Sequence, residues 1–187
     1  AIALSTKYSF EVTLAWATSF QGWGLAEKRE EQGLGRLAKG VSATQAAGAS
    51  LNNTFTLALL AEIYLQEKRI NEGLSVLSEA QKLVCSQGER CWQAELFRLK
   101  GELLLEQSKP SVSAAEHCFT EALKIAQEQD ASMLELRAAM SMGRLLRKLN
   151  RLDAAKLVLH SVCSRFQKQV ASPDLIEARN ILEQLNV

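Results

Sequence analysis

The chain repeats itself about every forty residues. The dipeptide Gly33-Leu34 recurs as Gly73-Leu74, and the charged run at 27–29 recurs at 67–69, in each case forty residues further on. With a two-residue insertion near Pro110, the same register continues to the end of the chain. A constant period of this length is typical of proteins built from one small structural unit that is repeated along the chain.

The repeated unit reads as two amphipathic helices joined by a short turn. In the stretch 92–131, apolar residues recur at helical spacing in two runs, separated by Ser108, Lys109 and Pro110. The first run is Trp92, Leu96, Leu99 and Leu103, and the second is Ala115, Cys118 or Phe119, Ala122, and Ile125 or Ala126. One helix pair cannot bury both apolar faces by itself, so we expect each pair to pack on its neighbours.

This pattern predicts an all-α fold, because no segment alternates polar and apolar residues for long enough to form a strand. The helices are expected near 6–27, 30–47, 54–68, 71–87, 90–107, 112–129, 133–149, 152–169 and 173–186. We interpret residues 1–187 as a single repeat domain with four helix pairs and a C-terminal capping helix. The pairs are 6–49, 53–88, 90–130 and 132–170, and the cap is 173–186.

Several residues mark the expected helix ends and crossings. Ser172 before Pro173 is a helix start, and Ser132 with Glu135 three residues later fits a capping box. Glycine stops are expected at Gly48 and Gly88. Small residues stand where the first helix of a pair should cross the second, so we expect the two helix axes to approach closely there. These residues are Ala61, Gly101 and Gly143. In the first pair, Gln21 stands at the aligned position.

The amino-acid composition limits the classes of partner that this chain is expected to bind. The chain has 22 Lys and Arg against 21 Asp and Glu, and a net charge of +1, so the positive field typical of nucleic-acid-binding domains is missing. The stretch 12–27 is interrupted by polar residues and is too short and too polar to span a bilayer. The four cysteines lack metal-binding CxxC spacing, which favours a reducing, cytoplasmic setting. We therefore expect no nucleic acid and no membrane among the partners.

The first helices of the pairs carry the candidate binding residues. Repeat stacks bind partners along the concave face formed by these helices. Charged residues there follow the apolar seam, and we predict them to line a partner-binding groove: Glu62, Glu95, Arg98, Glu102, Arg137, Arg144 and Arg147. The groove would be acidic in the middle and basic toward the C-terminal end, which suits a peptide or helix of matching charge. The alternative is a solvated face with local Glu/Arg pairs.

No pattern in the chain points to a reaction. His160 and Cys163 lie three residues apart, but nothing in the spacing completes four metal ligands or a catalytic triad, and no phosphate-binding Gly-x-x-x-x-Gly-Lys-Ser/Thr loop is present. We therefore expect no catalytic residue, no metal and no cofactor. Trp16, Trp23 and Trp92 are interpreted as packing residues.

Small residues at the crossings, with a large apolar residue three or four positions away, resemble the tetratricopeptide repeat, which implies a right-handed superhelical stack. The runs WQAELFRLKGELLL at 92–105, FTEAL at 119–123, LRAA at 136–139 and SPDLIEA at 172–178 resemble more closely the C-terminal helical-repeat tail of large bacterial signalling proteins. Those proteins join such a tail to an AAA-type ATPase and a class III adenylate or guanylate cyclase or other output domain.

The resemblance covers roughly residues 10–187 and implies a non-catalytic regulatory or scaffolding module that binds protein or peptide, including another domain of the same parent chain. Two other functions stay open: a small-molecule sensor with its ligand in the groove, as in related transcriptional activators, and a stand-alone adaptor. If the chain is a fragment, its N-terminal helix pair would expose an apolar face that could form a homodimer.

Overall fold

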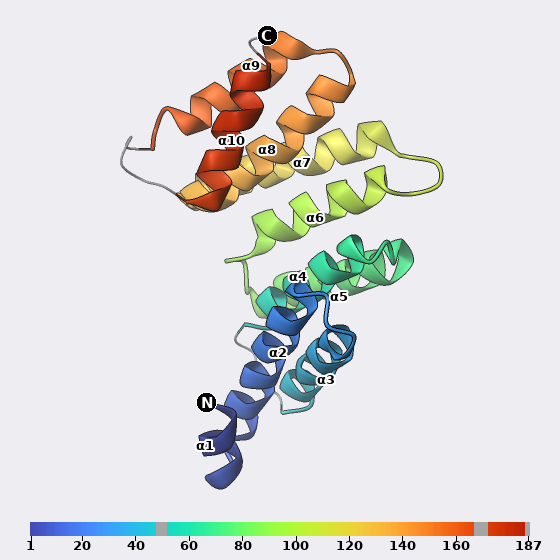
Figure 1. Ribbon diagram of the computed structural model, residues 1–187, viewed down its shortest axis with the longest axis vertical. Helices are drawn as coiled ribbons and strands as arrows, with labels where there is room; N and C mark the ends of the chain where they lie inside the picture. The colour runs from blue at the N-terminus through green and yellow to red at the C-terminus, as the bar shows by residue number, and fades with distance from the viewer. Residues whose placement is uncertain (48–51, 167–171, 186–187) are drawn as a thin grey trace. The chain divides into compact units, whose positions relative to one another are not determined.

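The structure is a computed structural model that describes residues 1–47, 52–166 and 172–185, and over these residues it is helical without any strand (Figure 1). The predicted all-α class is confirmed. The first five helices are α1 (Ile2–Lys7), α2 (Glu11–Glu27), α3 (Gln32–Ala46), α4 (Asn53–Gln66) and α5 (Ile70–Gln87). The others are α6 (Gln93–Leu105), α7 (Val112–Glu128), α8 (Ser132–Lys148), α9 (Leu152–Cys163) and α10 (Pro173–Gln184).

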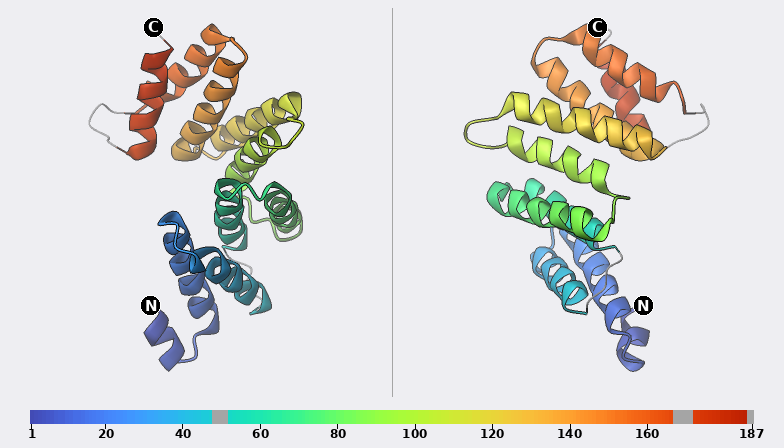
Figure 2. Two further views of the ribbon diagram at one scale, coloured as in Figure 1. Left: turned by 45° about the vertical axis from the view of Figure 1, so that its right-hand side comes forward. Right: turned by 180° about the vertical axis from the view of Figure 1, so that it is seen from behind.

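The chain divides into two compact units, Ala1–Leu99 and Lys100–Val187. In the first unit, α2 packs on α3 and α4 packs on α5, and α4 also contacts both helices of the preceding pair. In the second unit, α8 packs on α7 and α9, and α10 lies against α8 and α9 (Figure 2). Consecutive helices are therefore packing partners in each unit, as expected for helix pairs.

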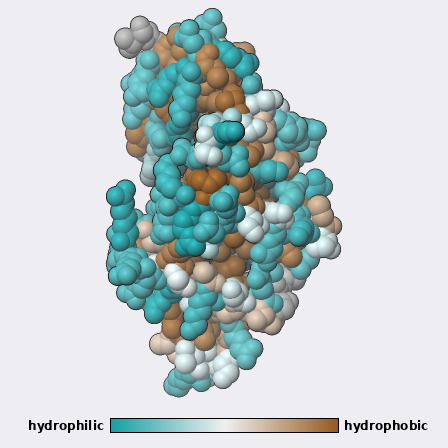
Figure 3. Space-filling view, turned by 90° about the vertical axis from the view of Figure 1, so that its right-hand side faces the viewer, coloured by the Kyte–Doolittle hydropathy of each residue, from teal (hydrophilic) through white to brown (hydrophobic). Residues whose placement is uncertain are grey.

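The core of the second unit is formed by apolar residues of α7, α8, α9 and α10. Phe119, Leu136, Leu159 and Leu175 are its largest members with no exposed surface. On the face drawn in Figure 3, hydrophilic side chains separate the apolar areas from one another.

The forty-residue register is visible in the burial of equivalent residues. The large apolar residue of each second helix is buried in all four pairs: Leu37, Leu77, Phe119 and Leu159. The small residue four positions earlier is buried in all four as well: Gly33, Gly73, Ala115 and Ala155. Because the same two positions point inward in each pair, the sequence repeat is also a repeat of local packing.

The expected close approach at the helix crossings is present in the second unit. A β-carbon at Gly101 would overlap the ring of Phe119, and one at Gly143 would lie 2.8 Å from Cδ1 of Leu159. In the first pair, the expectation that position 21 faces the crossing was wrong. Gly22 takes that place against the backbone of Leu37, and Gln21 is exposed. The backbone shows this one-residue shift, whereas the alignment does not.

The predicted helix over 6–27 is broken into α1 and α2. The N–H of Phe10 donates to the C=O of Ser5 at 2.9 Å, and Ser9 between them has a φ of +54°. A residue in the left-handed conformation ends an α-helix, so the chain turns here before α2 begins at Glu11. The Tyr8-Ser9 pair carries no glycine or proline, which is why the pattern alone did not predict the break.

The turn at Ser9 and four further connectors use one backbone pattern. After α2, the N–H of Glu30 donates to the C=O of Leu25 at 3.0 Å, and Arg29 has a φ of +59°. The same bond, across the same number of residues, surrounds each of three other left-handed residues: Lys68, Asp130 and Asn150. This is the Schellman arrangement, which satisfies carbonyls at the end of a helix. Gly88 ends α5 as predicted, with a φ of +72°, and Gly48 lies outside the described residues.

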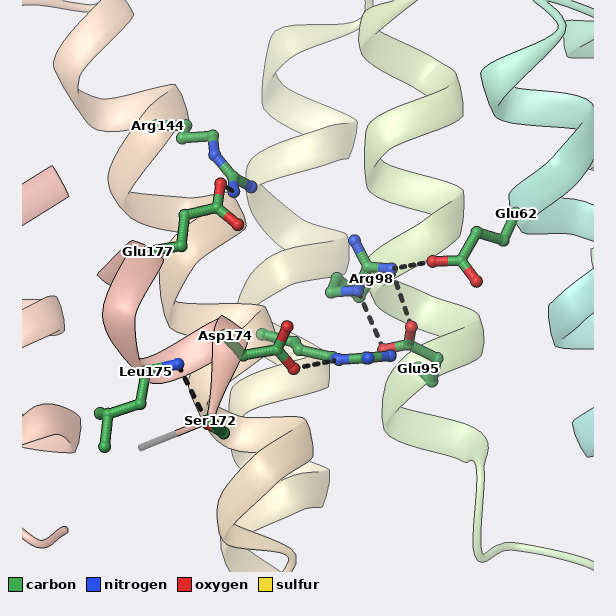
Figure 4. Close-up of polar contacts among 9 residues, drawn as sticks. Glu62, Glu95, Arg98, Arg144, Ser172, Asp174, Leu175 and Glu177 are labelled. Atoms are coloured by element: carbon green, nitrogen blue, oxygen red, sulfur yellow. Dashed lines mark hydrogen bonds and ion pairs between the residues drawn. The ribbon is translucent and has the colours of Figure 1, made fainter. Parts of the chain in front are cut away.

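Of the predicted serine caps at Ser172 and Ser132, the structure has the first and not the second. Oγ of Ser172 accepts a hydrogen bond from the N–H of Leu175 at 3.2 Å, so the start of α10 is confirmed (Figure 4). The capping box at Ser132 and Glu135 was wrong, because α8 is preceded by Ala131 and has no side-chain cap. Glu135 is instead buried, where it accepts from Nε2 of Gln127 at 2.8 Å and pairs with Arg165. Glu135 therefore bonds to residues outside α8 in place of the expected bond at the start of its own helix.

Candidate functional site

Three of the seven predicted groove residues form one polar cluster in the first unit. Nε and Nη2 of Arg98 donate to the two carboxylate oxygens of Glu95 at 2.9 and 2.7 Å, and Nη2 lies 3.9 Å from Oε1 of Glu62 (Figure 4). The Arg98 side chain is only 11% exposed and that of Glu95 only 4%. Because Glu62 belongs to α4 and the other two to α6, the cluster links two first helices.

Glu102, on α6, meets a residue of the next first helix within the second unit. Oγ of Ser141 on α8 donates to Oε1 of Glu102 at 2.6 Å. Ser141 is buried, so its hydroxyl needs an acceptor, and Glu102 supplies one. Glu102 is half-buried.

The three predicted arginines of α8 all reach α10. Nε of Arg137 donates to Oδ2 of Asp174 at 2.7 Å, and Nη1 of Arg147 donates to Oε1 of Gln184 at 2.8 Å. Arg144 forms an ion pair with Glu177 (Figure 4). These contacts run along the length of α10, so α8 and the capping helix are held together by polar groups beside their apolar seam.

The seven residues therefore connect successive first helices within each unit. The sequence left two interpretations open, a free partner groove or a solvated face with local pairs. Among the contacts described above, the Glu95–Arg98 bond is a local pair, and the others run between helices. Three positive side chains still reach solvent on α8, since Arg137 and Arg144 are 38% and 35% exposed and Arg147 is exposed as well.

Four partners of these residues were missed by the sequence analysis: Ser141, Asp174, Glu177 and Gln184. For two of them, Asp174 and Glu177, the sequence contains a pattern that could have indicated the contact. Asp174 and Glu177 lie three residues apart on the cap beside Leu175 and Ala178, which makes an acidic edge to an apolar stripe. An acidic edge on the cap matches the basic edge of α8.

The first unit also contains an aromatic group. The rings of Phe55 and Trp92 stack with centroids 4.2 Å apart, and Phe20 lies 5.9 Å from Phe55. Trp92 therefore packs on α4, in agreement with its interpretation as a packing residue. At the N-terminus, Leu4, Tyr8 and Phe10 are more than half exposed, so apolar surface is available on α1 and on the turn after it.

The cysteines and histidines form no cluster of metal ligands among the residues that the structure describes. All four cysteines are free; Cys85 and Cys91 are exposed and Cys118 is buried. Burial raises the pKa of the Cys118 thiol above its ordinary value, with Lys100 acting in the opposite direction, and burial likewise raises the pKa of Cys163. Over residues 1–47, 52–166 and 172–185, no three His, Cys, Asp or Glu side chains come close enough to hold a metal ion.

None of the helices described is both long and apolar enough to cross a membrane. Comparison of the chain with models of known families found no match, and comparison with characterised proteins found none either.

Proposed function

We propose that this chain is a non-catalytic protein-interaction module in which tetratricopeptide-like helix pairs stack and α10 caps the last pair. One observation carries this proposal: the same two positions are buried in all four pairs, at a spacing of about forty residues. A unit that buries the same face each time is suited to being stacked, and stacked first helices form an extended surface for a partner.

We place the partner surface on α8 and α10 in this proposal. Arg137, Arg144 and Arg147 keep part of their surface in water while each contacts α10. Ion pairs that remain this exposed contribute little to stability, so a partner carboxylate can compete for the guanidinium groups at small cost. This arrangement supports an acidic peptide or an acidic helix as the partner, and the exposed charges would raise its association rate.

We further propose that the parent protein is an ATPase or nucleotide-cyclase signalling protein and that this module regulates it from within the same chain. The support is the resemblance of the runs at 92–105 and 172–178 to the tails of such proteins. The DNA upstream of the codon for Ala1 tests this. A reading frame with a Gly-x-x-x-x-Gly-Lys-Ser/Thr loop agrees with the proposal, and a start codon directly before Ala1 contradicts it.

The docking proposal is tested with a double charge reversal, Arg144→Glu with Arg147→Glu. A control of equal charge change is Lys82→Glu with Lys124→Glu, at exposed positions on second helices. Both proteins are used as bait in extracts of the source cells, and captured proteins are quantified by mass spectrometry. We expect at least one acidic partner to be lost from the first variant and kept by the control; identical captures would contradict the proposal.

A further inference from the structure

The first helix pair has an open pocket that the sequence did not indicate. It lies between α2 and α3 beside α1 and has a volume of about 530 Å³. Its lining includes small or apolar residues, among them Ile2, Leu14, Ala15 and Ala43. Polar and charged side chains line it as well: Glu11, Thr18, Gln21, Arg36 and Lys39.

The second helix pair has a face that is equivalent to this pocket in the sequence register, and that face is buried. First helices are offset by 39 residues, as Gly22 and Ala61 show, so Thr18 and Gln21 correspond to Leu57 and Leu60. Leu57 is 1% exposed and Leu60 is 5% exposed, whereas Gln21 is exposed.

Both helices of the first pair, α2 and α3, contact α4, and a hydrogen bond also joins α3 to α5. We refer to α3 as the covering helix. It packs on α4, and Nε2 of its Gln45 donates to Oε1 of Glu79 on α5 at 2.6 Å. On the first pair, the six-residue helix α1 packs on α2, and its Ile2 lines the pocket. The open pocket therefore lies on a face whose equivalent in the second pair is covered.

The charge of this face also differs between the first and second pairs. Second helices are offset by 40 residues, so Arg36 and Lys39 stand where α5 has an apolar and an acidic residue, Val76 and Glu79. Over the part of the chain that is described, no hydrogen bond or ion pair reaches the side chain of either cation. Glu79 of the second pair receives a hydrogen bond from Gln45 of the covering helix. A helix that covers the first pair in the same way would meet Lys39 and would fit best with a carboxylate there.

We propose that this face, formed by α2 and α3 beside α1, is a docking site for an amphipathic helix of a partner protein that carries acidic side chains toward Arg36 and Lys39. The site is separate from the arginines of α8. Its test therefore succeeds or fails independently of the proposed function.

The test uses a fluorescein-labelled peptide that copies residues 32–46, the helix that covers the second pair. Gly33, Gly35 and Gly40 are replaced by alanine to favour a helix, and Gln45→Glu places an acid where Lys39 is expected. A second peptide carries Gln45→Lys instead. Binding to the full chain is measured by fluorescence anisotropy. We expect the peptide with Gln45→Glu to bind about two- to fivefold more tightly, which is the range of an exposed charge pair.

Three protein variants make the result specific. Lys39→Glu should reverse the preference between the peptides, while Lys82→Glu, an equal charge change on α5, should leave it unchanged. Ala43→Trp places a large side chain in the pocket and should abolish binding of both peptides; circular dichroism of this variant establishes that it is folded.

Four results would overturn the proposal. Equal binding of the two peptides, or binding that persists in folded Ala43→Trp, would show that the pocket is not the docking site. No saturable binding of either peptide would show that the face does not accept a helix of this kind. A dimer in sedimentation that dissociates in Lys39→Glu would assign the face to a second copy of the chain instead.

Discussion

Gly101 of α6 lies directly against the ring of Phe119 of α7, with no room for a β-carbon between them. Phe119 has no exposed surface, so its ring is held by the core around it and cannot move aside at little cost. A glycine in a helix interior lowers helix stability by about 1 kcal/mol relative to alanine. The glycine is retained because it lets the two helices approach closely around a large side chain.

Gly101→Ala is therefore expected to destabilise the protein, by about 1–3 kcal/mol, because the cost of overpacking exceeds the gain in helix propensity. Gly35→Ala is the control, since Gly35 is also helical but has open space where the β-carbon would go. That variant should gain up to about 1 kcal/mol. Urea unfolding followed by circular dichroism measures both. Phe119→Leu in the Gly101→Ala background should recover part of the loss; equal effects at 101 and 35 would contradict the packing account.

Arg98 is expected to be the most important of the predicted groove residues for stability. Arg98→Met would leave the carboxylate of Glu95 buried without its bidentate partner, and breaking a buried pair in this way costs roughly 3–5 kcal/mol. Arg151→Met removes the more exposed pair with Glu116 and should cost less than about 1 kcal/mol. Thermal unfolding of the two variants compares them. A similar loss in both would mean that the Arg98 cluster is no better protected from water than the Arg151 pair.

Arg29→Gly is expected to stabilise the protein by about 0.5–1 kcal/mol. Arg29 occupies the left-handed region, where a side chain is strained and glycine is not. Arg29→Ala separates this effect from the loss of charge, since alanine keeps the strain. Asn150→Gly should gain less, because asparagine tolerates the same conformation. Differential scanning calorimetry measures all three; a gain in Arg29→Ala equal to that in Arg29→Gly would assign the effect to charge.

The two serines at helix starts should respond differently to substitution. Ser172→Ala removes the side-chain acceptor of the Leu175 N–H and should cost about 1 kcal/mol. Ser132→Ala removes no cap bond and should change stability by less than about 0.5 kcal/mol. Chemical unfolding measured under one condition gives both values. A larger loss at Ser132 would restore the capping box that the sequence suggested.

The cysteines should react with a thiol reagent in two separate groups. Cys85 and Cys91 are exposed and should be labelled rapidly by dithiobis-nitrobenzoate at pH 8. Cys118 should be labelled slowly, because burial blocks the reagent and raises the thiol pKa, which lowers the fraction of reactive thiolate at that pH. Urea should remove the difference. Cys163 is half-buried and is replaced by serine in the test. Rapid labelling of Cys118 in Cys85→Ser/Cys91→Ser/Cys163→Ser protein without urea would contradict the buried position.

The sequence by itself determined the helical class, and it predicted a forty-residue register in which equivalent small and large apolar positions of the second helices are buried. It could do so because burial of one face imposes a periodic pattern that any chain of this kind must carry. The small residues at 101 and 143 and the cap at Ser172 were also readable, since each follows from local geometry or from steric size.

Only the tertiary structure decided what the charged residues do. Glu62, Arg98, Arg137 and Arg144 bond to groups on other helices, and Glu135 left its expected cap for Gln127 and Arg165. The break at Ser9 and the pocket beside α1 were decided in the same way. A polar side chain has several alternative partners, and which one it takes depends on distances in space that spacing along the chain does not encode.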